Sequence, residues 1–156
     1  MVGLIAGCGD DHKDAARVTT AAGEPLSKTA YENSFKAVFA RFEANPVVGP
    51  PANATPQQQG EALERALQRT RAAAAALARL DPPAEIRHAH EQFVEALREL
   101  AGQGEKAVAA LKAGDEARAQ RLVGSFAKPA TIAKITAARR EFARKGYSLG
   151  ETSPTP

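Results

Sequence analysis

The chain of 156 residues contains no tryptophan, a single cysteine and a single methionine, and only 5% of its residues are aromatic. One cysteine cannot form an internal disulfide, and it also excludes a metal site built from several cysteines. The scarcity of aromatic residues disfavours β-strands. Alanine, by contrast, makes up roughly a fifth of the chain and favours helices. The composition therefore predicts one all-α domain.

Sequence motifs of common catalytic and cofactor sites are also missing. No Gly-x-Ser-x-Gly elbow, phosphate-binding glycine loop, dinucleotide fingerprint or haem attachment motif occurs. His88 and His90 are two residues apart, so on a helix they point in different directions and cannot share a metal. Glu85 and His88 form one Glu-x-x-His step, whereas a di-iron bundle needs two steps and further carboxylates. We therefore expect no enzyme, no cofactor and no metal.

The cysteine follows a short apolar run, Leu4-Ile5-Ala6-Gly7-Cys8. This resembles the lipobox of bacterial lipoproteins, an aliphatic residue and two small residues before a cysteine whose thiolate takes up diacylglycerol. The resemblance implies a small helical lipoprotein, cleaved before Cys8 and anchored by lipid at the outer face of the cell membrane. Residues 1–7 lack the positive charge and the length of a complete signal. We therefore expect a leader that is truncated or whose start is misassigned.

The rest of the chain divides into three parts. Residues 9–25 show no sustained hydrophobic period, and the stretch from Gly9 to Leu26 carries four acidic and two basic side chains, as expected of a flexible tether. Residues 26–149 show amphipathic periodicity and form the expected domain. Residues 150–156 are expected to be a disordered tail. No stretch is apolar enough to span a bilayer.

Capping signals divide the domain into four helices. The first begins at Ser27, with Leu26 and Tyr31 as a hydrophobic staple, or at Thr29 through a capping box. The second begins at the capping box Thr55-Pro56-Gln57-Gln58 and runs to about residue 80. Asp81-Pro82-Pro83 is expected to end the second helix and to cap the third at once, since prolines favour the first helical turn.

Glycine and proline mark the later boundaries. Gly114-Asp115 ends the third helix and caps the fourth, and Pro129 should kink or split the fourth helix before Gly146 ends it. Short connections force antiparallel neighbours, so we predict an up-down antiparallel four-helix bundle. The third helix is expected to bury Ile86, His90, Phe93, Leu97, Leu100, Gly104, Val108 and Leu111, and the fourth Leu122, Phe126, Ile132, Ile135 and Phe142.

Basic residues gather near the end of the domain. Between Asp115 and Lys145 there are eight basic and three acidic residues. A solvated face is one interpretation, because the helix dipole favours cations near a C-terminus; a binding site for an envelope protein or an anionic polymer is the other. No aromatic residues interleave with these charges, so nucleic acid is not expected. The candidate partner-binding residues are Arg118, Arg121, Arg139, Arg140, Arg144 and Lys145.

Thr70 and His90 are polar residues at positions expected to face the core, where such groups need partners. Each can be satisfied locally, Thr70 by a backbone carbonyl one turn earlier and His90 by a neighbouring polar group. The alternative is a ligand cavity between the second and third helices, where Gly102 and Gly104 leave room.

The leading hypothesis is a non-enzymatic, lipid-anchored envelope protein that binds another protein or a polymer. A small-ligand carrier that uses Thr70 and His90 is the alternative. A cytosolic helical structural protein, in which the match around Cys8 arises by chance, is the third interpretation.

Overall fold

The computed structural model describes residues 24–43, 51, 53–125 and 129–150. Within these residues the protein is an all-helical bundle, with five α-helices and one 3₁₀ turn. The expected leader with Cys8, most of the expected tether and the tail beyond residue 150 lie outside the described residues. The elements are α1 (Lys28–Glu43), α2 (Pro56–Leu77), η1 (Ala84–Ile86), α3 (Arg87–Lys112), α4 (Glu116–Gly124) and α5 (Pro129–Arg144).

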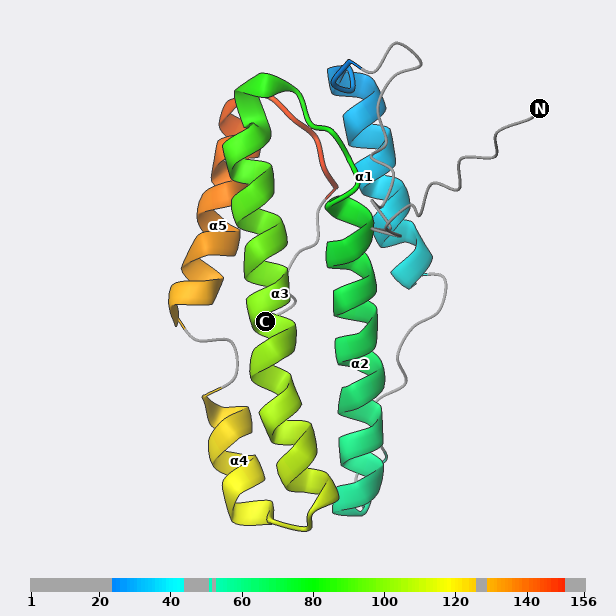
Figure 1. Cartoon of the computed structure of the whole chain (residues 1–156), viewed down its shortest axis with the longest axis vertical. Helices are drawn as coiled ribbons and strands as arrows, with labels where there is room; N and C mark the ends of the chain where they lie inside the picture. The colour runs from blue at the N-terminus through cyan, green and yellow to red at the C-terminus, as the bar shows by residue number, and fades with distance from the viewer. Residues whose placement is uncertain (1–23, 44–50, 52, 126–128, 151–156) are drawn as a thin grey trace, which may run out of the picture.

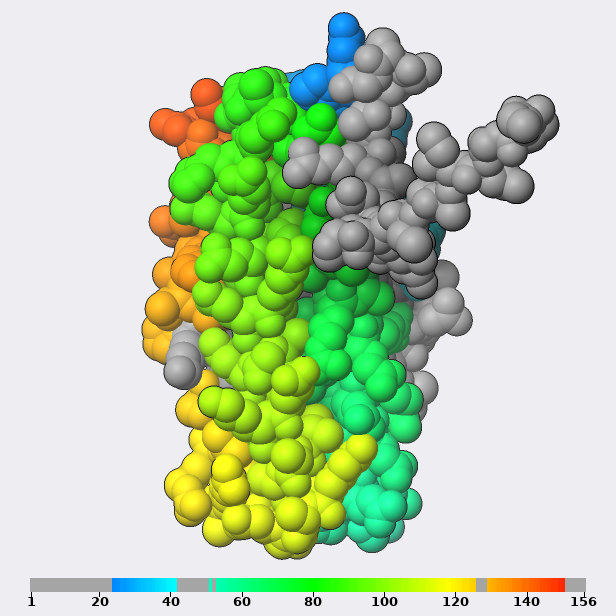
Figure 2. Space-filling model, viewed as in Figure 1, coloured from blue at the N-terminus to red at the C-terminus, as the bar shows by residue number. Residues whose placement is uncertain are grey.

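The helices α2 and α3 form a long hairpin, and the other helices pack against its sides (Figure 1). α1 lies beside α2, while α4 and α5 follow one another along α3. In the space-filling view the surfaces of α2 and α3 meet over the lower half of the molecule (Figure 2). One end of the bundle is therefore built from α1, α2, α3 and α5, and the other from α2, α3 and α4.

The core differs between these two ends. The larger cluster contains aromatic side chains from α1, α3 and α5, among them Phe35, Phe93 and Phe142. The smaller cluster, near α4, consists of Ala110, Leu111 and Ala119 with two half-buried leucines against it. An aromatic ring buries far more apolar surface than an alanine methyl group. Most of the hydrophobic stabilisation therefore lies at the end that contains α1 and α5.

The start of α1 follows one of the two predicted caps. The backbone N–H of Ala30 donates to Oγ of Ser27 at 3.3 Å, and the staple residues Leu26 and Tyr31 are both buried. A start at Thr29 was wrong, because Ser27 already accepts the bond from the first turn. Ser27 therefore fixes where α1 begins, and Leu26 holds the chain before it on the core.

The capping box of α2 is confirmed. The Gln58 N–H donates to Oγ1 of Thr55 at 3.2 Å, and the Thr55 N–H donates to Oε1 of Gln58 at 2.9 Å. The turn between α3 and α4 is confirmed as well: Gly114 has a φ of 71°, and the Asp115 carboxylate accepts from the Arg118 N–H at 3.0 Å. Both boundaries are decided by contacts within a few residues.

The link between α2 and α3 differs from the prediction. α2 ends at Leu77, and η1 stands between Asp81-Pro82-Pro83 and α3, so this triplet does not cap α3. The Leu26 N–H donates to the Asp81 carbonyl at 2.9 Å. This bond joins the link after α2 to the chain before α1. Asp81 precedes Pro82, and a residue before proline favours the extended backbone that such a bond requires.

Pro129 splits the expected fourth helix into α4 and α5. It stands at the first position of α5, where the N–H that proline lacks needs no partner. Ile132 was predicted to be buried but is 43% exposed. The prediction counted helical turns without interruption from α4, and the break before Pro129 changes which positions of α5 face the core. Phe126 lies outside the described residues. After α5, Tyr147 is buried and Leu149 packs on the core.

Candidate functional site

His90 lies in the core, with 4% of its surface exposed. The Tyr31 hydroxyl, from α1, is 2.9 Å from its Nδ1, and the Leu77 carbonyl at the end of α2 forms a hydrogen bond with the ring as well. A neutral imidazole carries one N–H and one acceptor nitrogen, so it can form hydrogen bonds with a hydroxyl group and with a carbonyl oxygen at the same time. His90 therefore connects α1, α2 and α3.

Burial determines the charge state of this pair. It lowers the pKa of His90 to about 4, against the opposing effects of the Leu77 carbonyl and of the nearby Glu91 and Asp81 carboxylates. Burial also raises the pKa of the Tyr31 hydroxyl. Both side chains are therefore neutral near pH 7, and their hydrogen bond requires no buried charge.

The structure does not bring Thr70 and His90 to one cavity. Oγ1 of Thr70 donates to the Ala66 carbonyl one turn earlier, at 3.1 Å. A cavity of about 260 Å³ beside His90 is lined by the link after α2 and by α3, including Asp81 and Arg98, but not by Thr70. Thr70 is thus satisfied within its own helix, as the first of its two interpretations predicted.

The six candidate basic residues lie in two groups. Arg118 and Arg121 are on α4, whereas Arg139, Arg140, Arg144 and Lys145 are at the far end of α5 and just beyond it. The stretch of α5 from residue 129 to residue 139 separates the groups by about 15 Å, at 1.5 Å per residue. They do not form one continuous cluster.

The group on α5 has other contacts. Arg144 pairs with Glu141, and Arg139 lines an aromatic cavity. Lys134, earlier on α5, is bound by Glu99 at 2.5 Å and by Glu95 at 3.5 Å. The hydrogen bond with Glu99 raises the pKa of the Lys134 ammonium group. Part of the positive charge of α5 is therefore compensated within the domain.

The group on α4 is more open. Of the nine residues of α4 only Ala119 is buried, while Arg118 and Arg121 are exposed. Val123 is 51% exposed, and Ile132 near the start of α5 is also an exposed large hydrophobic residue. Basic and apolar side chains therefore flank the connection between the two helices. At 3.6 residues per turn Val123 lies on the opposite side of α4 from Arg121. We use the name α4–α5 surface for the exposed side chains around α4 and the start of α5: Arg118, Arg121, Val123 and Ile132.

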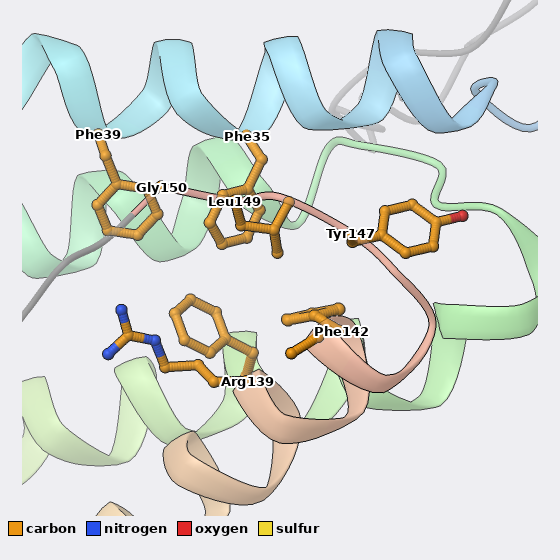
Figure 3. Close-up of a pocket in the computed structure, with 9 residues that line it drawn as sticks. Phe35, Phe39, Arg139, Phe142, Tyr147, Leu149 and Gly150 are labelled. Carbon is orange, nitrogen blue, oxygen red and sulfur yellow. The ribbon is translucent and has the colours of Figure 1, made fainter.

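A cavity that the sequence did not predict lies between α1, α3, α5 and the segment after α5 (Figure 3). Its volume is about 140 Å³. The hydrophobic periodicity of the sequence predicts that Phe93 and Phe142 are buried, but no signal in the sequence separates a fully packed ring from one that borders a space. The residues that matter most for its chemistry are Phe35, Phe39, Phe93, Phe142, Arg139 and Leu149.

Comparisons with known proteins found no match to a family model, a curated protein or a solved structure. In the described part of the chain, no three His, Cys, Asp or Glu side chains are placed to hold a metal ion. Among the same residues no helix is long and apolar enough to cross a membrane.

Proposed function

We propose that this chain is a non-enzymatic protein of the bacterial cell envelope, anchored by lipid on Cys8, whose helical domain binds an acidic protein surface. The observation that carries the proposal is the sequence Leu4-Ile5-Ala6-Gly7-Cys8, which resembles a lipobox at every position. Residues 9–25 act as the spacer. A flexible chain of that length has a root-mean-square span of about 20–25 Å, enough to hold the domain clear of lipid headgroups.

The α4–α5 surface supports an acidic protein as the partner. Its arginines favour negative charge, and arginine is enriched at protein interfaces. Val123 and Ile132 gain only if apolar groups cover them, which a protein surface supplies and a highly charged polymer does not. An anionic polymer would use the arginines and leave both hydrophobic residues in water.

A binding role is further supported by the state of the buried titratable groups. A general acid or base has to reach a substrate. His90 lines the cavity beside the link after α2, but its Nδ1 is engaged by the Tyr31 hydroxyl and burial lowers its pKa to about 4, so we assign it a role in the fold. The α4–α5 surface offers contacts and no nucleophile.

We further propose that the domain is an up-down antiparallel four-helix bundle in which α4 and α5 together form the fourth helix. The short connections from α2 to α3 and from α3 to α4 support this arrangement, because they allow only antiparallel neighbours. In such a bundle the outer side of α4 remains available to a partner.

The anchor is tested by phase partition in detergent. The protein is expressed in a bacterium with whatever coding sequence precedes it, as wild type, as Cys8→Ala and as Gly9→Ala, a neighbouring change that leaves the lipobox intact. We expect the wild type and Gly9→Ala to enter the detergent phase and Cys8→Ala to remain in the aqueous phase. Aqueous partition of all three would overturn the proposal.

A further inference from the structure

The residues that follow α5 lie in a groove between α5 and α1. Gly146, with a φ of 75°, turns the chain out of the helix. Figure 3 shows Tyr147, Leu149 and Gly150 in order along the segment as it passes between the two helices. We call residues 146–150 the strap. Because α5 ends before the strap begins, the strap can leave the groove without unfolding of a helix.

The Tyr147 side chain occupies a site that fits a tyrosine. Tyr147 is 6% exposed, and its ring packs edge-on against Tyr31, with centroids 5.8 Å apart. The Lys28 ammonium group lies 5.2 Å from the ring centroid, within the range of a cation–π interaction. The Tyr147 hydroxyl donates to Oε1 of Glu85 at 2.6 Å. Both the ring and the hydroxyl group are therefore recognised.

The next two residues add a backbone contact and an apolar contact. The Ser148 N–H donates to Oε1 of Glu32 on α1 at 2.8 Å. This bond uses the backbone, and Ser148 is exposed, so other residues fit the same position. Leu149 packs on the aromatic cluster and lines the cavity. The groove therefore recognises an extended segment with the pattern Tyr-x-Leu, in which x is any residue with an N–H.

The strap is held less firmly than the helices. The cavity of about 140 Å³ next to Leu149 shows that packing beneath the strap is incomplete. The carboxylates of Glu32 and Glu85 both have contact with solvent, so water can replace the bonds that they accept. Departure of the strap would leave the cavity-lining rings of Phe35 and Phe142 without this cover, and exposed apolar surface favours a new occupant.

We propose that the groove between α1 and α5 binds an extended Tyr-x-Leu segment of a partner protein, and that the strap is an internal competitor for the same groove. The partner's tyrosine takes the place of Tyr147, its leucine takes the place of Leu149, and its backbone N–H donates to Glu32. An attached competitor acts at an effective concentration on the order of millimolar. Binding in this groove does not depend on the lipid anchor or on the α4–α5 surface.

A blocked peptide with the sequence of the strap, acetyl-GYSLG-amide, tests the proposal. It is titrated into the isotope-labelled full chain while the NMR signals of the Glu32 and Phe142 amides are followed. Ser148→Pro removes the N–H that Glu32 accepts and should loosen the strap, whereas Ser148→Ala keeps it. We expect saturable shifts with Ser148→Pro, and at least tenfold weaker binding to the wild type and to Ser148→Ala.

Two results of this titration would overturn the proposal. One is the absence of saturable shifts with Ser148→Pro up to about 10 mM peptide. The other is equal binding to the wild type and to Ser148→Pro, which would show that the strap does not compete. Thermal unfolding verifies the fold of each variant, and Tyr147→Ala, which empties the tyrosine site, is a second variant with an open groove.

Peptide and protein controls locate the contacts. With Ser148→Pro, the peptide acetyl-GASLG-amide, which lacks the tyrosine, should bind at least tenfold more weakly, and acetyl-GYALG-amide should bind equally well. Glu32→Ala, added to Ser148→Pro, should weaken binding roughly fivefold, whereas Lys36→Ala, at an exposed position of α1, should have little effect. Equal binding of the peptides with and without the tyrosine would contradict recognition of the Tyr-x-Leu pattern.

Discussion

The Tyr31 hydroxyl and Nδ1 of His90 lie 2.9 Å apart in the core, although 59 positions separate the two residues in the sequence. The Tyr31 ring also packs edge-on against His90 and against Tyr147, with centroids 5.7 and 5.8 Å away. α1 is thereby held on the α2–α3 hairpin by a polar bond as well as by apolar packing. A buried polar pair of this kind is costly to separate, because each group loses a hydrogen-bond partner inside the core.

The Tyr31→Phe variant tests this pair. The change keeps the ring and leaves Nδ1 of His90 without this hydrogen-bond partner, so we expect a loss of about 1–3 kcal/mol in the free energy of unfolding. Urea unfolding followed by circular dichroism measures it. The matched control is Tyr147→Phe, which removes a bond to Glu85, an exposed carboxylate that water can solvate. A cost for Tyr31→Phe no larger than that for Tyr147→Phe would contradict a stabilising role of the buried bond.

The low pKa of His90 predicts that stability falls in mild acid. Burial holds the folded pKa at about 4, whereas in the unfolded chain a histidine titrates near 6.5. Between these values the unfolded state binds a proton that the folded state does not, so the free energy of unfolding decreases as the pH falls from 6.5 towards 4. From this group alone the protein should be about 1 kcal/mol less stable near pH 5.5 than near pH 7.5.

Urea unfolding at a series of pH values checks this dependence. His90→Gln removes the titrating group and should flatten the curve between pH 5 and 6.5, whereas His88→Gln, at an exposed histidine on the same helix, should leave it unchanged. A wild-type curve that is already flat in this range would show that His90 is not shielded from protonation by burial.

The sparse core beneath α4 predicts that this helix opens readily. Because α4 buries only Ala119, few apolar contacts are lost when it unfolds locally. In hydrogen-exchange mass spectrometry we expect peptides from Glu116–Gly124 to exchange faster than peptides from the first half of α3, which packs in the aromatic cluster. Equal protection of the two helices would indicate that α4 is held by more than its contact with α3.

The proposed partner surface can be tested by site-specific cross-linking in the envelope. A photoreactive benzoylphenylalanine in place of Val123 should give a cross-linked protein product, and the double change Arg118→Glu with Arg121→Glu should abolish it. The same probe at Ala72, an exposed position on α2, is the control for random contact, and Arg65→Glu, also on α2, is the control for charge. A product that forms equally from Ala72, or that survives reversal of both α4 arginines, would contradict the α4–α5 surface.

Short-range signals predicted much of the fold. The cap at Thr55 and the turn at Gly114 each depend on residues within one or two turns, so the sequence contains all the information needed. Pro129 was expected to kink or to split the fourth helix, and the structure shows the split. The start at Ser27 was one of two possibilities, and the burial of Leu26 and Tyr31 against the rest of the domain decided between them.

Long-range pairings account for what the sequence could not predict. Periodicity placed His90 in the core but could not name Tyr31 as its partner, because the partner comes from another helix. The bond between the Leu26 N–H and the Asp81 carbonyl could not be predicted for the same reason. The aromatic cavity depends on how four phenylalanine rings tilt against one another, and a pattern of apolar positions contains no information about tilt.

The mass of the N-terminal peptide, measured on protein purified from the membranes of a bacterium that expresses it with its preceding coding sequence, tests the proposed function most directly. We expect a mature chain that begins at Cys8 and carries a diacylglyceryl group, with residues 1–7 removed. An unmodified Cys8 within a chain that still carries residues 1–7 would contradict it.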